Sequence, residues 1–529
     1  MTSPEPYSPS CSLPPRAWWL LAAAILCLFI PTLFHPLGPD QSLFNLNGMM
    51  LLKGQVYYRD MVDMKPPLIS FLYAAANLIF GAGEQSMRFL DLLLQGLTCW
   101  LIIAVVRRAG GDDRFAALAA LCHALLYTAQ RYSDTMQSES YVGLFGLAML
   151  WLLLDKPTFM RFLLAGIVGG MLWLLKFPFA ILLLLAPLTE RMLFRRSARA
   201  IIGHTLVMGI GFGIIVGAFL LYLTGANAWD DFLLVSNFMR GYAMSELQSP
   251  GQWLLNLVTV LPYHLVADFS PLLLFAVIMG FRQGWRGRAD RESFMQPGRI
   301  SLRICTIAFM MMLGTIILEG KYPNYHFVRL FPFGAILAGC GLLCLAGSIG
   351  NRWRMGMAWK VVIIAVVLAA GPLPAYVWRT ILPVGSQMLH AGTPARFARY
   401  DFSVNETRSV GGRIAFERRP GDEMFVAASI PGQIYYHSRL RPMTPVYHFA
   451  FVSDTYGARQ WSDSVRSYLL GSRPRFIVAE LTDSYPSLIG STLTSHQRLL
   501  RLPGIDSLLK TGYGEMMRTE HLVVYQRNQ

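Results

Sequence analysis

The sequence predicts a polytopic α-helical membrane protein, with about eleven transmembrane helices followed by a small α/β domain. Of the 529 residues, 54% are hydrophobic and only 15% are charged. Several uninterrupted apolar runs approach the roughly 20 residues that a helix needs to cross a bilayer. From about residue 385 the chain becomes polar and mixed, which indicates a separate folded domain outside the membrane.

Eleven apolar runs are the predicted spans. The first run ends at Pro31, Phe34 and His35 without a small-x-small cleavage site, so we read it as a retained span rather than a secretory signal. The apolar run at 68–80 is short and follows a proline pair. We therefore do not count it as a span, and a half-span and an interfacial helix are the two alternatives. The predicted spans are 17–34, 86–107, 114–130, 139–154, 161–177, 178–194, 200–224, 258–281, 302–319, 327–348 and 358–380.

The positive charges of the short loops orient the chain. Its net charge is +15, and with the N-terminus inside, the Lys and Arg clusters of alternate loops all fall on the cytoplasmic side. Those clusters lie at 107–114, 156–161, 191–199, 282–303 and 352–360. The pattern predicts a multi-pass protein of a bacterial-type inner (plasma) membrane. The loop at 35–85 and the C-terminal domain then face the extracytoplasmic side.

We predict two domains, a transmembrane domain at 1–384 that includes the outward loop 35–85, and an extracytoplasmic α/β domain at 385–529. Strand-like runs lie at 424–428, 433–437, 475–479 and 521–525, and helical spacing of apolar residues lies at 461–470 and 495–509. The seven cysteines fall in the N-terminal segment or in membrane runs. Their spacing supports neither a disulfide framework nor a zinc site.

Charged residues cluster directly after the first span. Asp40 is a candidate general base, since a partly desolvated carboxylate at a membrane surface suits proton abstraction. The alternative is that Asp40 caps a helix over 41–53. Lys65 precedes the Pro66-Pro67 pair and is suited to neutralise a lipid phosphate, the alternative being a snorkelling interfacial lysine. Arg88 lies at the outer start of the second span. The same two alternatives apply to it, a phosphate-binding cation or a snorkelling interfacial cation.

Further polar residues are predicted on the same outward side. Asp60 and Asp63 are candidates to bind a divalent cation or sugar hydroxyls. Ionisable groups at membrane depth are functional by default, and three more such residues lie at the outward ends of spans. In addition, a Lys-Tyr-Pro-Asn-Tyr-His segment is suited to contact a phosphate and a sugar together. These further candidates are Asp134, Glu139, Lys176, Lys321, Tyr322, Tyr325 and His326.

Together these residues resemble the GT-C superfamily of polyprenyl-phosphate-sugar-dependent glycosyltransferases. The similarity is greatest to glycosyltransferase family 39, which includes protein O-mannosyltransferases and the lipid A aminoarabinose transferase. The ordered set spans most of the membrane part. It consists of Asp40, Gly54-Gln55-Val56-Tyr57-Tyr58-Arg59-Asp60, Lys65-Pro66-Pro67-Leu68, Phe80-Gly81, Arg88, Glu139, Lys176 and the stretch from Tyr322 to Pro332.

The resemblance implies a GT-C type fold and a hexosyl or pentosyl transferase. Such an enzyme moves a sugar from a polyprenyl-phosphate carrier to an acceptor hydroxyl on the extracytoplasmic face, with inversion. Asp40 would be the catalytic base, and the donor phosphate would be held by Lys65, Arg88, Lys321 and Tyr322. The residues left for acceptor or sugar contacts are Asp60, Asp63, Asp134, Glu139, Tyr325 and His326.

The implied partners are a polyprenyl-phosphate-linked sugar donor, a glycan, lipid or protein acceptor, and membrane lipid, without nucleic acid. No nucleotide is needed, no cofactor is established, and dependence on a divalent cation is left open. One position departs from the family pattern. Many members carry Asp-Glu at the catalytic position, whereas Gln41 follows Asp40 here. A second carboxylate, if this branch uses one, would come from Asp63, Asp134 or Glu139.

Two other classes of protein compete with a transferase. A multi-span transporter or lipid flippase also needs many spans with embedded charge. Two features count against it: no inverted repeat of broken helices is evident, and the polar residues gather at one predicted face of the membrane rather than at its midplane. A non-catalytic membrane scaffold would make the loop cluster accidental. The sequence therefore favours the transferase.

Overall fold

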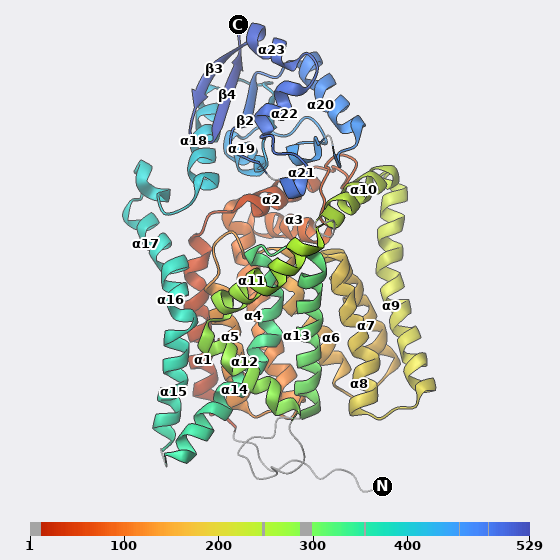
Figure 1. The fold of residues 1–529 in the computed structure, drawn as a ribbon, viewed down its shortest axis with the longest axis vertical. Coiled ribbons are helices and arrows are strands. Elements are labelled where there is room, and N and C mark those ends of the chain that lie inside the picture. The colour runs from red at the N-terminus through yellow and green to blue at the C-terminus, as the bar shows by residue number, and fades with distance from the viewer. Residues whose placement is uncertain are drawn as a thin grey trace. The chain divides into compact units, whose positions relative to one another are not determined.

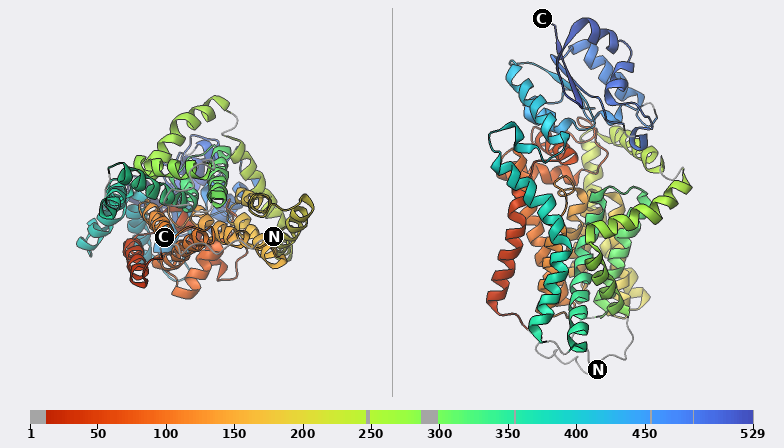
Figure 2. Two further views of the ribbon diagram at one scale, coloured as in Figure 1. Left: turned by 90° about the horizontal axis from the view of Figure 1, so that it is seen from below. Right: turned by 60° about the vertical axis from the view of Figure 1, so that its left-hand side comes forward.

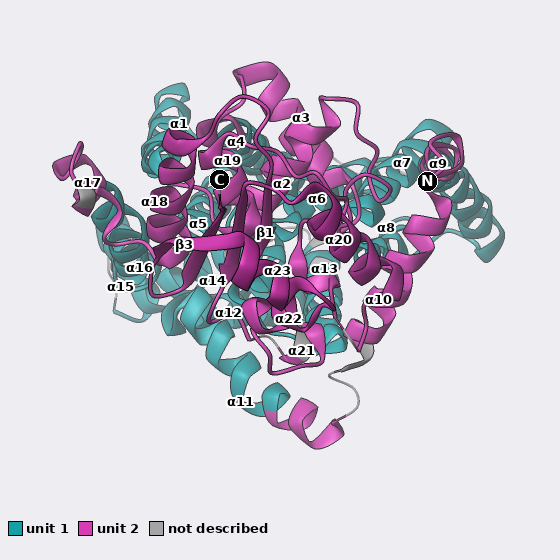
Figure 3. Cartoon of the chain, turned by 90° about the horizontal axis from the view of Figure 1, so that it is seen from above, with its two compact units in different colours: residues 1–35, 90–217, 256–384 teal, residues 36–89, 218–255, 385–529 magenta. Residues whose placement is uncertain are grey.

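The structure is a computed structural model and describes residues 12–245, 249–285, 299–353, 356–453, 455–484 and 486–528. It is mostly helical, with one small sheet near the C-terminus (Figure 1). The chain divides into two compact units (Figure 3). Unit 1 comprises residues 1–35, 90–217 and 256–384, and unit 2 comprises residues 36–89, 218–255 and 385–529. Each unit is therefore assembled from three separate segments of the chain.

Unit 1 is a helical bundle. Helices α4, α9 and α11 extend beyond its limits, and 3₁₀ turns precede or extend several of the others. Its helices are α1 (Pro15–Phe29), α4 (Glu84–Arg108), α5 (Asp113–Thr128), α6 (Val142–Leu153), α7 (Phe159–Leu175), α8 (Leu185–Leu193), α9 (Ala198–Gly225), α11 (Pro250–Phe269), α12 (Pro271–Trp285), α13 (Arg299–Glu319), α14 (Phe331–Arg352), α15 (Met357–Ala370) and α16 (Pro372–Tyr376).

Helix α14 forms the centre of unit 1. It packs against α5, α12 and α13, and most of its residues are buried. Glycines allow its closest approach to α12, because a Cβ atom added to Gly341 would lie 1.8 Å from the carbonyl oxygen of Ala276. A Cβ atom on Gly280 would lie 2.0 Å from the carbonyl oxygen of Leu337. Small residues at such contacts are typical of packed membrane helices.

Six of the described helical segments are long and apolar enough to cross a membrane. They are 15–34, 84–108, 198–225, 302–319, 324–352 and 357–389. The pair α11 and α12 adds a seventh if its two helices count as one broken span. Helices at 68–80, 138–153 and 159–175 are apolar but shorter. The predicted polytopic α-helical fold is thus confirmed, whereas the number of eleven spans stays a prediction.

The predicted span at 258–281 is wrong in one respect, because it is not one straight helix. Helices α11 and α12 meet at an angle of 98°. The break falls at Ser270, whose φ of 62° is incompatible with a right-handed helix, and Pro271 begins the next helix. Proline lacks the N–H that would continue the hydrogen-bond ladder of α11. The apolar run alone gave no sign of this change of direction.

Unit 2 contains the helices around the loop at 36–89 and those of the C-terminal region. Helix α2 packs against α3 and α19. Helix α17 (Leu382–Leu389) begins in unit 1 and ends in unit 2. The other helices of unit 2 are α2 (Pro39–Leu51), α3 (Leu68–Phe80), α10 (Trp229–Ser245), α18 (Phe402–Glu417), α19 (Pro431–Ser438), α20 (Arg459–Ser472), α21 (Pro486–Ile489), α22 (Ser495–Arg501) and α23 (Ile505–Gly512).

The sheet of unit 2 has four strands in the order β1-β2-β4-β3. Its strands are β1 (Met424–Ala427), β2 (Phe476–Glu480), β3 (Tyr513–Arg518) and β4 (Leu522–Arg527). Strands β1 and β2 are parallel, with Met424 opposite Phe476, and β4 runs antiparallel to both β2 and β3. Helix α22 packs on β1 and β2, and α23 packs on β3. This region is drawn in blue at the C-terminal end of the chain in Figure 2.

Three of the predicted strands are confirmed as β1, β2 and β4. The predicted strand at 433–437 is wrong, because this segment lies in α19, which begins at Pro431 and buries one side on α2. The predicted helix at 495–509 is divided into α22 and α23 at Pro503 and Gly504, whose φ is 84°. Helix α18 and strand β3 were not predicted. The domain boundary at residue 384 stays a prediction.

Candidate active site

Asp40 lies in the first turn of α2. The residue that caps this helix is Gly38, whose backbone N–H donates to the side-chain oxygen of Gln41 at 2.7 Å. Pro39 occupies the first helical position, where its missing N–H costs nothing. The alternative role of Asp40 as the cap of a helix over 41–53 is therefore wrong. The side chain of Asp40 remains 39% exposed, so its carboxylate is accessible to a reactant.

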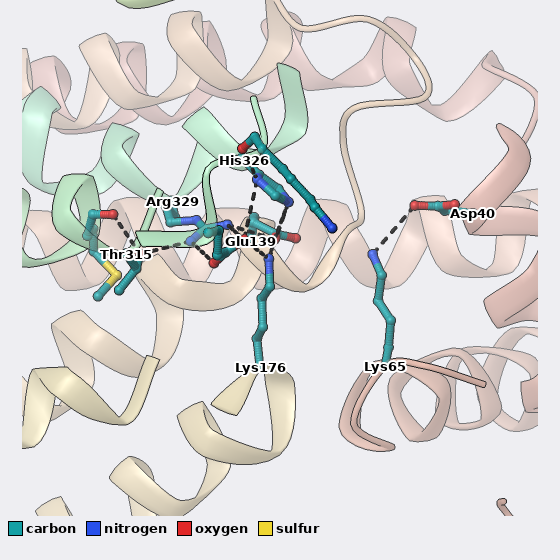
Figure 4. Close-up of polar contacts among 10 residues, drawn as sticks. Asp40, Lys65, Glu139, Lys176, Thr315, His326 and Arg329 are labelled. Atoms are coloured by element: carbon teal, nitrogen blue, oxygen red, sulfur yellow. Dashed lines mark hydrogen bonds and ion pairs between the residues drawn. The ribbon is translucent and has the colours of Figure 1, made fainter. Parts of the chain in front are cut away.

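Lys65 pairs with Asp40. Its Nζ atom lies 3.5 Å from Oδ2 of Asp40, and Figure 4 shows the ammonium pointing at the carboxylate. The same ammonium lies 5.0 Å from the centre of the Phe44 ring, a cation–π contact with the next turn of α2. The Lys65 side chain is only 17% exposed. The structure thus brings together the predicted base and the predicted phosphate-binding cation.

The backbone of Lys65 is held on both sides. Its N–H donates to Oδ1 of Asp63 at 2.9 Å. Its carbonyl oxygen accepts the hydroxyl groups of Tyr57 and Tyr58 at 3.2 and 3.3 Å. Pro66 and Pro67 follow without N–H groups of their own, so these three hydrogen bonds determine how the chain enters α3. Lys65 is therefore presented by an ordered loop.

Asp63 is buried beneath this loop. Besides the Lys65 N–H, its carboxylate accepts the side-chain amide of Asn47 at 2.7 Å. Burial raises the pKa of Asp63 to about 6, against the opposing effects of these two hydrogen bonds and of the Lys65 ammonium. The Asn47 side chain also accepts the hydroxyl of Tyr447. Asp63 thus connects the loop to α2, and through Asn47 to the C-terminal part of unit 2.

Asp60 has different partners from Asp63. Its carboxylate pairs with the Arg59 guanidinium at 2.8 Å and accepts the backbone N–H of Val56, also at 2.8 Å. The hydrogen bond from Arg59 is the main reason that the pKa of Asp60 is lowered. Each of the two loop carboxylates, Asp60 and Asp63, is therefore engaged in its own local hydrogen bonds. A role in binding a cation or a sugar stays a prediction for both.

Arg88 is buried in the second turn of α4. Its guanidinium donates to the carbonyl oxygen of Pro36 at 2.6 Å and to the side-chain oxygen of Gln41 at 3.3 Å. Both acceptors flank the start of α2, so Arg88 braces the turn that carries Asp40. Gln41 thereby links the N-terminus of α2 to a buried cation. Contact of Arg88 with a phosphate stays a prediction.

A second polar cluster lies within unit 1 (Figure 4). Glu139 accepts hydrogen bonds from Lys176 at 2.9 Å and from Arg329 at 3.1 Å. Glu319 pairs with the same two cations, at 2.6 Å from Lys176 and 2.7 Å from Arg329. Arg329 also donates to the hydroxyl of Thr315 at 2.8 Å. Two carboxylates thus balance two cations, which offsets the cost of burying charge.

His326 joins this cluster as a neutral imidazole. Its Nδ1 atom lies 3.0 Å from the carbonyl oxygen of Lys321, and its Nε2 atom lies 3.2 Å from Nζ of Lys176. A carbonyl can only accept, and an ammonium can only donate. The ring proton is therefore on Nδ1. Tyr325 meets the His326 ring edge-on at 4.8 Å, and Tyr322 is buried in the same turn.

The remaining candidate, Asp134, is buried in the turn before Glu139, where its backbone N–H donates to the carbonyl oxygen of Arg131 at 3.0 Å.

Glu319 and Arg329 were not among the predicted site residues. A signal for both was present, because each is an ionisable residue at the edge of a predicted span, and such residues are rarely without a partner. The sequence did not indicate that their partners would be Glu139 and Lys176.

Within the part of the chain that the structure describes, one group of His, Cys, Asp and Glu side chains has ligand atoms spaced for a metal ion. It consists of Glu406, Glu520 and His521. Glu406 already accepts hydrogen bonds from Nδ1 of His521 at 2.7 Å, from the His521 backbone N–H and from the hydroxyl of Thr519. These bonds tie the turn between β3 and β4 to α18. None of the predicted site residues belongs to this group.

One family model matches part of the chain. Residues 64–245 match the model described as dolichyl-phosphate-mannose-protein mannosyltransferase. This segment includes Lys65, Arg88, Asp134, Glu139 and Lys176. A search of curated proteins finds no match.

Solved structures show a similar fold over nearly the whole chain. ArnT from Cupriavidus metallidurans in the apo state is 15% identical, with a TM-score of 0.59 over 96% of this chain and 98% of ArnT. The apo oligosaccharyltransferase of Archaeoglobus fulgidus is 13% identical, with a TM-score of 0.53 over 97% of this chain and 74% of that protein. Arabinofuranosyltransferase AftD from Mycobacteria is 14% identical, with a TM-score of 0.54 over 99% of this chain and 41% of AftD.

The family match and the shared fold agree with the ordered motifs in the sequence. Similar structures at such low identity establish the fold, and the family match covers the segment that carries the loop lysine and the first membrane charges. The resemblance read from the sequence is thereby confirmed. The chain is a multi-pass membrane protein that shares the fold of ArnT, the oligosaccharyltransferase and AftD, and its residues 64–245 match a mannosyltransferase family model.

Proposed function

We propose that this protein transfers a sugar from a polyprenyl-phosphate carrier to an acceptor hydroxyl at the extracytoplasmic face of the membrane, with inversion. Asp40 is the base and Lys65 holds the donor phosphate. The observation that carries the proposal is the pairing of the exposed Asp40 carboxylate with the Lys65 ammonium at 3.5 Å. In this proposal the Asp40 carboxylate takes up a proton, and the Lys65 ammonium stabilises the departing phosphate.

The chemistry is a single displacement at the anomeric carbon. The acceptor oxygen forms a bond to C1 of the sugar while the bond from C1 to the phosphate oxygen breaks. The hydroxyl proton goes to the Asp40 carboxylate, and the electron pair leaves with the polyprenyl phosphate. Phosphate is a stable leaving group, so the protein mainly supplies orientation, a base and a cation where negative charge develops.

The proteins of similar fold support a lipid-phosphate donor. The family model describes a dolichyl-phosphate-mannose-protein mannosyltransferase. A second structure of ArnT, with a TM-score of 0.55, has undecaprenyl phosphate bound. The oligosaccharyltransferase of Archaeoglobus fulgidus, with a TM-score of 0.51, has been tethered to an acceptor peptide. A lipid-linked donor and a separate acceptor are therefore the partners that we propose for this chain.

The other predicted residues take supporting roles in this proposal. Lys321 and Tyr322 add contacts to the donor phosphate, and Arg88 acts by bracing the turn that carries Asp40. The remaining contacts to the sugar or the acceptor are assigned to Asp60, Asp134, Glu139, Tyr325 and His326. The geometry favours Asp63 as a positioning residue, since its carboxylate is buried and fixes the Lys65 backbone.

The decisive experiment compares Asp40→Asn with wild-type protein in reconstituted membranes. We expect sugar transfer from a polyprenyl-phosphate donor to fall by about 10²–10⁴-fold, the usual contribution of a general base, while the melting temperature is unchanged. Asp506→Asn is the control, because Asp506 is an exposed carboxylate paired with Lys510 in α23. Full activity of Asp40→Asn would reject Asp40 as the base.

Lys65→Gln separates donor binding from proton transfer. We expect weaker binding of polyprenyl phosphate, with Lys510→Gln as the control for loss of an exposed lysine. Unchanged lipid-phosphate affinity would remove Lys65 from the donor site. A transporter or flippase would instead move the lipid-linked sugar across vesicles without breaking a glycosidic bond. Mass spectrometry of the products distinguishes that outcome from transfer and identifies the sugar and the acceptor.

A further inference from the structure

A cavity of about 620 Å³ lies at the opposite end of α2 from Asp40. Helix α2 has 13 residues, so its two ends are about 18 Å apart along the axis. The cavity is bounded by the last turn of α2, the turn before β1 and the end of α19. Its lining residues are Leu46, Met49, Met50, Lys53, Gly421, Asp422, Glu423, Tyr435, Tyr436, Arg439, Leu440, Arg441 and Met443.

A second hollow of about 310 Å³ continues this cavity. The two share Arg441 and Met443, and the second is further lined by residues of the loop after α2, among them Gln55 and Asp60. Together they form one depression, which we call the α2–α19 groove. The groove lies entirely within unit 2, and none of its lining residues belongs to the Asp40–Lys65 pair.

The lining of the groove holds three cations and three acids. Lys53, Arg439 and Arg441 are exposed there, and among the described residues none of these three forms an ion pair. The acidic residues of the lining are already engaged. Asp422 pairs with Arg475 at 2.7 Å, and Glu423 accepts the hydroxyl of Tyr468 at 3.1 Å.

The loop carboxylate in the second hollow is also engaged. Asp60 pairs with Arg59, outside the lining, at 2.8 Å. Two of the three acids are thus neutralised by arginines outside the lining. The three cations then outnumber the remaining acid, Glu423, and leave a net positive charge for an anionic ligand.

Arg439 has an unusual backbone conformation. It follows α19 with φ 57° and ψ 24°, in the left-handed region. Glycine or asparagine normally occupies this position after a helix, because other side chains are strained there. Arg195 and Arg473 also have positive φ, so this conformation sets where the Arg439 side chain leaves the backbone and does not by itself indicate a function.

We propose that the α2–α19 groove binds an extended anionic glycan, a saccharide chain that carries phosphate or carboxylate groups. The arginines contact those groups, and the tyrosine and methionine side chains contact the sugar rings. This inference rests on the proposed function, because the bound chain is the acceptor whose hydroxyl reaches Asp40 at the far end of α2. Binding energy at the groove thereby positions a reacting group about 18 Å away.

The lining favours a glycan over a membrane lipid. It mixes polar and apolar side chains, among them Tyr436, Glu423, Met49 and Met443. Sites of mixed lining fix the orientation of a ligand through a few polar groups. Acyl chains would need a continuous apolar trough, and a peptide that adds a strand to a sheet would need free backbone partners along a strand edge. The groove presents neither, since it is built from two helices and two turns.

Binding to purified full-length protein tests the proposal. The probes are a short oligogalacturonate and a phosphorylated oligomannoside, with neutral maltopentaose, oligoglutamate and phosphatidylglycerol vesicles as comparisons. The variant is Arg439→Asn/Arg441→Gln, in which asparagine keeps the left-handed backbone accessible. Arg501→Gln is the matched control, since Arg501 is exposed in α22 outside the groove. Thermal melting verifies that each variant is folded.

We expect an anionic saccharide to bind the wild-type protein, with affinity that falls as salt is raised. The double variant should lose about tenfold in affinity for each arginine removed, while Arg501→Gln stays within twofold of wild type. Absence of saccharide binding would overturn the proposal. So would equal binding by the double variant, or tighter binding of oligoglutamate or of the vesicles than of either saccharide.

The two proposals fail in distinguishable ways. If the groove has no role, Arg439→Asn/Arg441→Gln retains wild-type donor binding and wild-type transfer. If Asp40 is not the base, Asp40→Asn transfers sugar normally, and binding of the anionic saccharide is unaffected. If both proposals hold, Asp40→Asn binds the saccharide at wild-type affinity without transferring sugar to it.

Discussion

The carboxylate of Asp63 accepts the backbone N–H of Lys65 at 2.9 Å. This bond makes the position of the half-buried Lys65 depend on a buried acid, which also accepts the amide of Asn47. Asn47 in turn accepts the hydroxyl of Tyr447. The loop that presents Lys65 is thereby fixed to α2 and to the C-terminal part of unit 2 by a chain of hydrogen bonds.

This arrangement predicts a pH dependence of stability that disappears in Asp63→Asn. Burial raises the pKa of Asp63 from 3.8 to about 6, so between pH 4 and 6 the folded chain holds a proton that the unfolded chain has released. The contribution of Asp63 to the free energy of unfolding is therefore complete below pH 4. It falls by about 3 kcal/mol as the pH rises through 6. Melting curves from pH 4.5 to 7 should show wild type losing stability relative to the variant. Parallel curves would contradict the assignment.

Gln41 should tolerate a carboxylate but not an apolar side chain. Its side-chain oxygen accepts the Gly38 N–H and the Arg88 guanidinium. Gln41→Glu keeps both bonds and adds a negative charge near the helix N-terminus, so we expect equal or greater stability. Gln41→Leu removes both acceptors beside a buried cation, at a cost of about 1–3 kcal/mol. Thermal melting ranks the variants, and a Glu variant that melts below the Leu variant would refute the bracing role of Arg88.

The buried cluster of unit 1 should behave as a charge-balanced group. Arg329→Met leaves Glu139 and Glu319 with Lys176 alone, and the uncompensated charge should cost about 3–5 kcal/mol. Adding Glu139→Gln restores the balance between Glu319 and Lys176. We therefore expect the double variant to be more stable than Arg329→Met alone. A double-mutant cycle on melting temperatures measures this coupling, and additive losses would show that the charges do not act together.

Contact between α19 and α2 should depend on Gly432. A Cβ atom added there would lie 2.5 Å from the carbonyl carbon of Ser42 and 2.6 Å from the amide nitrogen of Leu43. Both are backbone atoms of α2, so Gly432→Ala should displace α19 and cost about 1–3 kcal/mol. Gly412→Ala is the control, because Gly412 lies in α18 with nothing within 4 Å of the added Cβ atom. That variant should melt at or slightly above the wild-type temperature, and an equal loss in both would refute the packing argument.

Local patterns in the sequence predicted much of the fold. Every predicted membrane run corresponds to helical structure, and the strands at 424–428, 475–479 and 521–525 were recognised from their apolar, β-branched residues. The segment at 433–437 has similar composition but forms α19. Its helical state depends on Pro431 and on burial against α2, and a contact with a distant segment is not encoded in local periodicity.

The candidate site was predicted less completely. Asp40 and Lys65 stood out because charged residues near a membrane span are costly and seldom incidental. Asp63 was noted as a carboxylate, but its position beneath the loop was not foreseen. Glu319 and Arg329 were missed, since their role depends on Glu139, which is 190 residues from Arg329 in the chain.

The sequence by itself predicted a helical membrane protein with a GT-C type fold, and it singled out the acid and the lysine after the first span. Residue type and periodicity indicate the burial and secondary structure of each local segment, so these features could be predicted from the sequence. Only the tertiary structure decided which charges pair, which carboxylate is buried, and that cations from α2 and the end of α19 line one groove. Such pairings join residues far apart in the chain, and their energies depend on distance and burial in the folded molecule.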